Sequence, residues 1–231
     1  MAEFDAVFFD IDGTLLAGGP LMHEAFREAF ADQGLTIEVE PWRGSGKVDY
    51  EIINLFLDDF PFDEEKKAEL RPLLSESLVK AVIKRVREHG ARALPGTVEL
   101  IRALREQGFT PGLLTGNHDA ITGPKLEAAG IHRGDFFYGG FGDVSPNRAD
   151  TVRHALDSVS AFLGREIDPE RALVIGDTPN DIACARAVGA KVLAVATGRF
   201  GMDDLAKYEP DFLLKDLSDT DAVLEIIGLP H

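Results

Sequence analysis

The chain has 231 residues, of which 45% are hydrophobic and 28% are charged, so it is long enough to bury the core of a globular domain. Its 40 acidic and 24 basic residues give a net charge of −16, which disfavours binding to nucleic acid and to anionic membrane surfaces. The single cysteine, Cys184, excludes an internal disulfide, and the first residues lack a signal-peptide pattern. We therefore expect a cytoplasmic protein, a monomer or a homodimer, that binds neither nucleic acid nor membranes.

The first predicted element is a strand over residues 6–9, where four apolar residues precede Asp10-Ile11-Asp12-Gly13-Thr14. Such a run near the start of a chain is typical of a buried central strand. If it is one, Asp10 and Asp12 lie at its carboxyl end, which is the edge where open α/β sheets bind ligands. An Asp-Gly pair after a strand also suits a hairpin turn, and the rest of the chain has to decide between the two.

Residues 17–91 have helical periodicity and no strong strand signal. Apolar residues recur at helical spacing in three stretches, at 21–30, 52–57 and 74–86. Asp49 and Asp63 are predicted to cap helices, and Pro72 is expected to break or kink the helix that contains it. Glycine and proline flank both ends of the segment, which favours an insert that swings over the end of the first strand, although a rigidly packed helical subdomain with simple turns is the alternative.

Strands and helices alternate from about residue 95 to the end. Strands are predicted at 109–115, 136–141, 172–175, 192–196 and 212–214, and helices at about 96–108, 120–129, 150–163, 179–188 and around 223–227. This alternation predicts an α/β fold with a Rossmann-like parallel sheet and helices on both faces. We therefore expect an α/β core domain of residues 1–16 and 92–231, with a small all-helical domain of residues 17–91 inserted after the first strand.

Polar residues follow three further predicted elements at this edge of the sheet. The Thr115-Gly116-Asn117 turn offers a hydroxyl and backbone N–H groups to an oxyanion, or it is an ordinary polar turn. Asp177 and Asp181 follow a buried strand and suit a magnesium site, although acidic residues are also favoured at the start of a helix. Arg148 precedes a helix, where it is either a fixed charge for the site or a solvated residue.

Four stretches of the chain, taken in order, resemble the four motifs of the haloacid-dehalogenase-like hydrolase superfamily. They are residues 10–14, the Thr115–Asn117 turn, a basic residue, and Gly176-Asp177-x-x-x-Asp181. The helical insert after the first motif resembles the type-1 cap of that superfamily. Within the superfamily the chain resembles the phosphoglycolate-phosphatase-like branch, through Pro95-Gly96 and the segment 125–131. The motifs specify the superfamily and leave the substrate open.

The resemblance implies a Mg²⁺-dependent phosphatase that acts on a small phosphorylated metabolite, similar to phosphoglycolate or a sugar phosphate. Asp10 would attack phosphorus and form an aspartyl-phosphate, because a carboxylate nucleophile divides one difficult displacement into two steps. Asp12 would protonate the leaving oxygen and then activate water. The resemblance also implies that Mg²⁺ is bound by Asp10, the backbone carbonyl of Asp12 and Asp177, with Asp181 as an auxiliary residue. It implies that Thr115, Gly116 and Asn117 bind the phosphoryl group.

One position departs from the pattern of the superfamily. Its third motif usually supplies a lysine, and no lysine lies between Lys125 and Lys191. Arg148 stands about where that lysine belongs, and its permanent charge and forked donors suit a phosphate, although arginine and lysine are not interchangeable. Lys125 is the rival candidate, and we expect it to lie on the surface of a helix.

The loop Gly46-Lys47-Val48-Asp49 in the insert resembles the cap loop that faces the phosphate site in this branch. Lys47 would then reach the substrate, with Arg43 as the second candidate. Alternatively, Lys47 is an exposed loop residue beside a helix cap. Trp42 either lines the pocket or anchors the loop in the small core of the insert.

Three other functions remain open. A mutase of the beta-phosphoglucomutase type would share every core residue and return the phosphoryl group to a sugar. A haloacid dehalogenase is disfavoured by Asp12, because a halide leaving group needs no general acid. A non-enzymatic, phosphate-accepting domain of the receiver type is disfavoured by the helical insert and by the pairing of Asp10 with Asp12.

Overall fold

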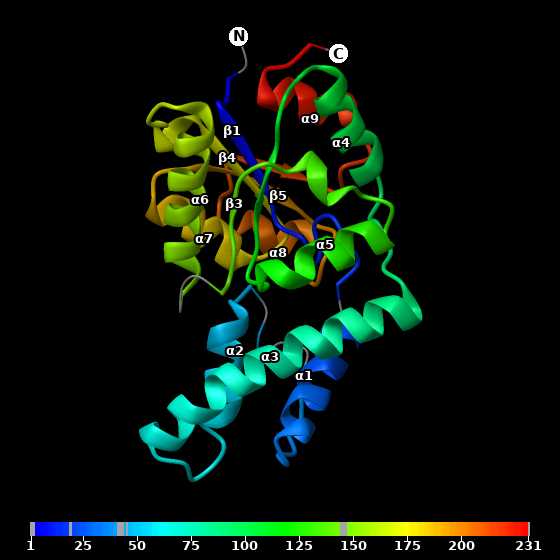
Figure 1. Ribbon diagram of the computed structural model, residues 1–231. Helices are drawn as coiled ribbons and strands as arrows, with labels where there is room; N and C mark the ends of the chain where they lie inside the picture. The colour runs from blue at the N-terminus through cyan, green and yellow to red at the C-terminus, as the bar shows by residue number, and fades with distance from the viewer. Residues whose placement is uncertain (1–2, 19, 41–43, 45, 144–146, 231) are drawn as a thin grey trace.

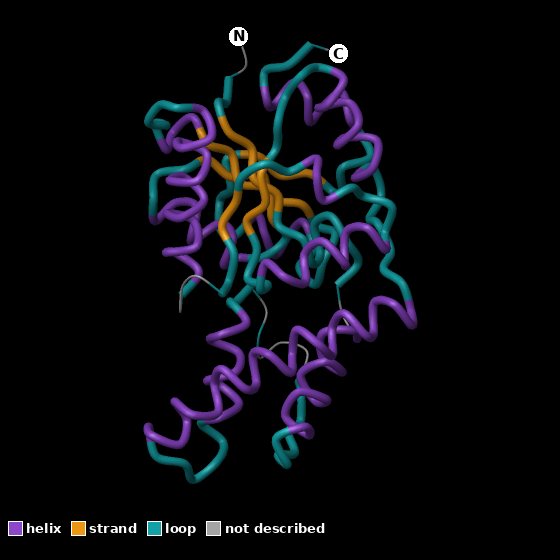
Figure 2. Tube along the Cα trace, in the orientation of Figure 1, coloured by secondary structure: helices purple, strands orange, loops and turns teal. Residues whose placement is uncertain are grey.

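The computed structural model describes residues 3–18, 20–40, 44, 46–143 and 147–230. A six-stranded parallel sheet lies between two layers of helices, and three further helices lie beyond the carboxyl ends of its strands (Figures 1 and 2). The strand order is β3-β2-β1-β4-β5-β6. The strands are β1 (Ala6–Phe9), β2 (Gly112–Leu114), β3 (Gly139–Gly140), β4 (Ala172–Gly176), β5 (Lys191–Val195) and β6 (Phe212–Leu214).

The helices of the described residues follow the predicted alternation. They are α1 (Pro20–Asp32), α2 (Asp49–Leu57), α3 (Glu64–His89), α4 (Thr97–Glu106), α5 (Asp119–Ala128), α6 (Arg148–Leu163), α7 (Pro179–Ala187), α8 (Met202–Ala206) and α9 (Thr220–Ile227), with short 3₁₀ helices at Arg133–Asp135 and Pro169–Arg171. Within the described part of the chain, no helix combines the length and the apolar character that crossing a bilayer requires.

Strand β1 occupies the centre of the sheet. It pairs in parallel with β2 on one side and with β4 on the other, so both of its edges are filled and the hairpin alternative is wrong. Its four side chains are fully buried and alternate between the two faces of the sheet. Val7 and Phe9 pack in the hydrophobic core under α4, α5 and α9, whereas Ala6 and Phe8 pack in the core under α6, α7 and α8. The predicted Rossmann-like fold is confirmed.

Helices α1, α2 and α3 enclose a separate hydrophobic cluster. It includes Phe26 and Phe30 of α1, Phe56 of α2, and Leu74 of α3, and the rings of Phe30 and Phe56 meet edge to face at 5.8 Å. Ile121 of α5 also belongs to this cluster, and α3 packs against α5, the helix that follows β2. The three helices therefore stand over the carboxyl end of the sheet (Figure 1).

Two details of these helices correct the sequence analysis. Helix α3 continues through Pro72 without a break, because Leu70 and Leu74 pack into the cluster on either side of it. Asp49 begins α2 rather than capping it, and Val48 occupies the N-cap position. The predicted cap at Asp63 is confirmed, since its carboxylate accepts a hydrogen bond from the Lys66 N–H at 2.8 Å.

Two strands are shorter than predicted and one helix was not predicted, and the first of these strands, β2, covers Gly112–Leu114 rather than 109–115. Strand β3 comprises only Gly139 and Gly140, whereas the sequence suggested a strand over 136–141. Helix α8 was not predicted, because five residues are too few to show a helical period.

Candidate active site

The turn after β1 places Asp10 and Asp12 at the edge of the sheet. The N–H of Asp10 donates to the Ile175 carbonyl of β4 at 2.9 Å, which extends the strand pairing by one residue. The chain then turns tightly, as the N–H groups of Leu15 and Leu16 both donate to the Ile11 carbonyl. Asp10 is buried, whereas about a quarter of the Asp12 side chain (27%) is exposed. The two carboxylates therefore differ in their access to solvent.

Asp177 follows β4 and packs against the backbone of two glycines. A Cβ at Gly13 would lie 2.4 Å from an Asp177 carboxylate oxygen, and a Cβ at Gly198 would lie 1.7 Å from it. Gly13 also has a φ of +92°, which favours glycine. The Thr197 hydroxyl donates to the Gly13 carbonyl and holds the two segments together. The sequence analysis missed Gly198, although its position just after β5 places it at the same edge of the sheet.

Three buried carboxylates meet beside one arginine. Oxygen atoms of Asp10, Asp177 and Asp181 all lie within 4.8 Å of one another. The Arg148 Nη2 atom is 3.1 Å from Asp10 Oδ1 and 2.6 Å from Asp181 Oδ1. The other oxygen of Asp181 accepts hydrogen bonds from the N–H and the hydroxyl of Thr178. Asp181 therefore holds Arg148 in place beside Asp10, and the role of Arg148 as the third-motif cation stays a prediction.

The cluster concentrates negative charge out of water. Burial raises the pKa of Asp10 to about 7, although the positive charge of Arg148 opposes the shift. Burial, with Asp181 and Asp10 nearby, also holds the pKa of Asp177 well above its usual range. Burial would lower the pKa of Arg148, but Asp181 and Asp10 raise it above its usual value, so Arg148 stays charged. Burial and like charges thus disfavour the ionised forms of Asp10 and Asp177, and a divalent cation bound to their oxygens would relieve this cost.

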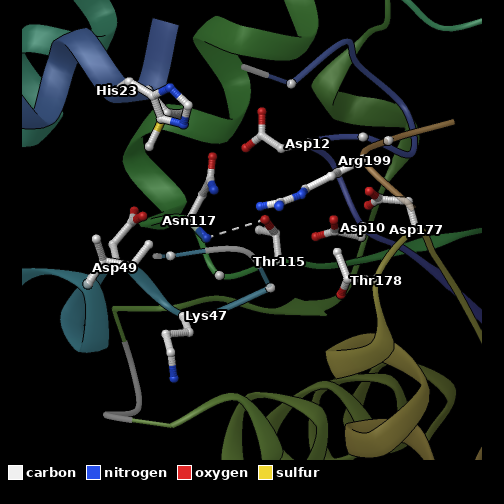
Figure 3. A pocket seen from close by; sticks show the side chains of 18 of the residues that line it. Asp10, Asp12, His23, Lys47, Asp49, Thr115, Asn117, Asp177, Thr178 and Arg199 are labelled. Atoms are coloured by element: carbon white, nitrogen blue, oxygen red, sulfur yellow. Dashed lines mark hydrogen bonds between the residues drawn. The ribbon is translucent and has the colours of Figure 1, made fainter. Parts of the chain in front are cut away.

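The Thr115–Asn117 turn lies at the end of β2 beside these carboxylates. The Thr115 N–H donates to the Gly140 carbonyl of β3, and the Asn117 N–H approaches the Thr115 hydroxyl oxygen at 3.3 Å (Figure 3). Both side chains line a cavity of about 500 Å³ that Asp10, Asp12 and Asp177 also line. The strand-end residues from separate motifs therefore open onto one space.

Residues 4–189 match the haloacid dehalogenase-like hydrolase family. The chain belongs to this family. A phosphoglycolate phosphatase of Salmonella paratyphi A is 27% identical over 241 residues, covering 97% of this chain and 93% of that protein. These matches confirm the resemblance to the family and to its phosphoglycolate-phosphatase-like branch.

Two solved structures share the fold. A predicted phosphoglycolate phosphatase from Haemophilus somnus 129PT has a TM-score of 0.73 at 22% identity, covering 98% of this chain and 99% of that one. A beta-phosphoglucomutase from Clostridium difficile has a TM-score of 0.71 at 17% identity and covers 97% of each chain. These two structural similarities show the fold of this hydrolase and do not identify its substrate.

The loop before α2 contacts the site through its backbone. A Cβ at Gly116 would lie 2.3 Å from the Lys47 carbonyl oxygen, and the Asp49 N–H donates to the Gly116 carbonyl at 2.8 Å. The Lys47 side chain is 39% exposed, lies 3.7 Å from Glu51, and extends away from Asp10 and Asp12 in Figure 3. The structure therefore brings the Lys47 backbone, but not its amine, to the Thr115–Asn117 turn. Arg43 and Trp42 lie outside the described residues.

Lys125 is not the surface residue that the sequence analysis expected. Its side chain is only 3% exposed, and its Nζ atom donates to Asn117 Oδ1 at 2.7 Å and pairs with the Asp12 carboxylate. Ile121 precedes it by one helical turn and is fully buried, so Lys125 lies on the inward face of α5. The site of this hydrolase thus contains a second buried cation besides Arg148.

Asp49 is a buried carboxylate between α2 and the turn after β2. Its Oδ2 atom accepts a hydrogen bond from the His118 N–H at 3.0 Å. Burial raises the pKa of Asp49 to about 7, although the His118 hydrogen bond and the charge of Lys125 oppose the shift and the carboxylates of Asp12 and Asp143 add to it. In the folded protein the neutral form of Asp49 is therefore favoured up to about pH 7.

This raised pKa predicts a pH-dependent stability. The folded pKa lies above the unfolded value near 4, so the contribution of Asp49 to stability is complete in acid and is lost as the pH rises through about 7. Asp49→Asn stays neutral and can still accept the His118 hydrogen bond. Between pH 5 and pH 8, the free energy of unfolding of Asp49→Asn should therefore rise relative to wild type by about 2 kcal/mol. Urea unfolding at both pH values measures this difference, and a constant difference would contradict it.

Proposed function

We propose that this haloacid dehalogenase-like phosphatase hydrolyses the phosphomonoester of a small metabolite, of the phosphoglycolate or sugar-phosphate type, through an aspartyl-phosphate on Asp10. We further propose that residues 1–16 and 92–231 form its catalytic core and that residues 17–91 form a cap. The observation that carries the proposal is the convergence of Asp10, Arg148 and the Thr115–Asn117 turn at the carboxyl ends of the parallel strands.

The proposed reaction has two steps. First, an oxygen of the Asp10 carboxylate attacks phosphorus, the bond from phosphorus to the leaving oxygen breaks, and Asp12 gives a proton to that oxygen. Second, Asp12 takes a proton from water, the water oxygen attacks phosphorus, and the bond to Asp10 breaks to release inorganic phosphate. Arg148 balances the charge beside Asp10, and Thr115 and Asn117 donate hydrogen bonds to the phosphoryl oxygens.

The donor set supports Mg²⁺ as the cofactor. Mg²⁺ is usually bound by one or two carboxylates and retains several waters. Asp10 and Asp177 would hold the ion together with the backbone carbonyl of Asp12, whereas the oxygens of Asp181 are occupied by Arg148 and Thr178. When bound, Mg²⁺ supplies positive charge that lets an anionic substrate approach the carboxylates.

The cavity supports a small anionic substrate. Besides Arg148, it is lined by Arg92, where the chain returns from the insert, and by Arg199, in the loop after β5. Figure 3 shows the Arg199 side chain extending into the space between Asp12 and Thr115. In a chain with a net charge of −16, these local cations provide the attraction that a phosphorylated acid or sugar needs.

The test is a phosphate-release assay with p-nitrophenyl phosphate, followed by a panel that includes phosphoglycolate and hexose phosphates. We expect release of inorganic phosphate with Mg²⁺ and loss of release with EDTA, restored by added Mg²⁺. Release that is insensitive to EDTA would overturn the role of Mg²⁺. Conversion of one sugar phosphate into its isomer, followed by NMR, would establish the mutase alternative instead.

A further inference from the structure

Lys125 is a buried cation whose function none of the four motifs explains. It is one of the charged residues that are almost never fully buried without a partner. Here the partners are Asp12 and Asn117, which belong to two separate motifs of the site. A single ammonium group therefore connects the residue proposed for proton transfer with a residue proposed for phosphoryl binding.

The two buried cations divide the carboxylates of the site between them. Arg148, at the start of α6, contacts Asp10 and Asp181, whereas Lys125, near the end of α5, contacts Asp12. The cations come from different helices, so each can hold its own carboxylate without the other. Asp10 and Asp12 are only two residues apart, and separate cations keep their side chains in separate environments.

The contact with Asn117 also fixes the orientation of its amide. An ammonium group has hydrogen-bond donors and no acceptor, so Lys125 Nζ must face the amide oxygen at 2.7 Å. The amide nitrogen of Asn117 then remains available to donate to an anion in the cavity that this side chain lines. Without the lysine, the amide could rotate and present its oxygen, which repels a phosphoryl group.

We propose that Lys125 is a positioning residue that holds Asp12 for proton transfer and Asn117 for phosphoryl binding. This inference rests on the proposed phosphatase function. It assigns to Lys125 a role that differs from that of Arg148, because Lys125 acts through Asp12 rather than through Asp10. The loss of kcat on removing Lys125 must then overlap with the loss of kcat on removing the Asp12 carboxylate. A lysine with a purely structural role would instead add an independent loss of kcat.

The experiment is a double-mutant cycle of Lys125→Met and Asp12→Asn, measured as kcat and KM for an alkyl phosphate from the substrate panel. We expect each single variant to lower kcat by about 10²-fold or more, which is the usual contribution of a general acid or base. The double variant should be no slower than Asp12→Asn alone. Lys125→Met should also raise KM, because the Asn117 amide is released. Losses in kcat that multiply in the double variant would overturn the proposal.

Lys125→Gln is the second variant, since its amide can still donate to Asn117 but carries no charge for Asp12. We expect it to keep the wild-type KM and to lose kcat as Lys125→Met does. Lys207→Met, which removes an exposed lysine after α8, is the matched control and should retain wild-type kinetics. Thermal unfolding of every variant separates a folding defect from a kinetic one.

The outcomes distinguish this inference from the proposed function. A wild-type protein that releases phosphate from no compound of the panel would overturn the proposed function. If the wild type is active and both Lys125→Met and Lys125→Gln turn over at the wild-type rate, only the proposed role of Lys125 is overturned. If Lys125→Met does not fold, the cycle is run with Lys125→Gln, and the same requirement of non-multiplying losses in kcat applies.

Discussion

Asp10→Asn is expected to reduce phosphate release by roughly 10⁴-fold or more, the scale of loss seen when a nucleophile is removed. Asparagine lacks the charged oxygen that attacks phosphorus, so the aspartyl-phosphate does not form. The fold should persist, because asparagine has nearly the same shape and its amide oxygen can still accept from Arg148, which lies 3.1 Å from Asp10 Oδ1. The variant therefore separates the chemistry of this side chain from its packing.

The measurement combines phosphate release with mass spectrometry of acid-quenched reactions. Wild type should carry one phosphoryl group during turnover, and Asp10→Asn should carry none. Asp5→Asn is the matched control, because Asp5 lies just before the opposite end of β1 and pairs with Arg171 at 2.8 Å on the surface. It should retain turnover and lose at most about 1 kcal/mol of stability. A phosphoryl group on Asp10→Asn would show that another residue is the nucleophile.

The sheet could be predicted from the sequence because its strands are short apolar runs followed by polar turns. Strand β1 shows this best, since Ala6–Phe9 is buried on both faces and Asp10 marks its end. Strand β3 could not be delimited in the same way, because Gly139 and Gly140 have no side chains that reveal a pattern. The continuity of α3 through Pro72 also escaped prediction, since it depends on the packing of Leu70 and Leu74 against other helices.

The strand-end carboxylates could be predicted because parallel strands bring their ends to one edge. The position of Lys125 depends instead on which face of α5 is buried. Its spacing of four residues from Ile121 places it on the apolar face, and this was the signal available in the sequence. The direction of the Lys47 side chain had no such signal, because residues in loops have no fixed period. In the structure the Lys47 backbone packs against Gly116, and its amine lies 3.7 Å from Glu51.

Arg148→Ala is expected to weaken both stability and catalysis. Removing one partner of a buried ion pair leaves its carboxylates without compensation, which destabilises a fold by about 3–5 kcal/mol. Here the uncompensated groups are Asp10 and Asp181, and both lie within 3.1 Å of the lost Nη2 atom. Removing one group that stabilises transition-state charge lowers kcat by roughly 10²–10³-fold. Urea unfolding without metal and kcat/KM with saturating Mg²⁺ measure the two effects separately.

The matched control for this prediction lies on the same helix. Arg153 of α6 pairs with Asp150, and its side chain is 57% exposed, so Arg153→Ala should change stability by less than about 1 kcal/mol and leave kcat/KM unchanged. Arg148→Lys keeps a charge but loses the planar fork, so it should recover more stability than turnover. If Arg148→Ala retained full turnover while losing stability, Arg148 would be a structural counter-charge, and the cation that assists phosphoryl transfer would have to be another residue of the cavity.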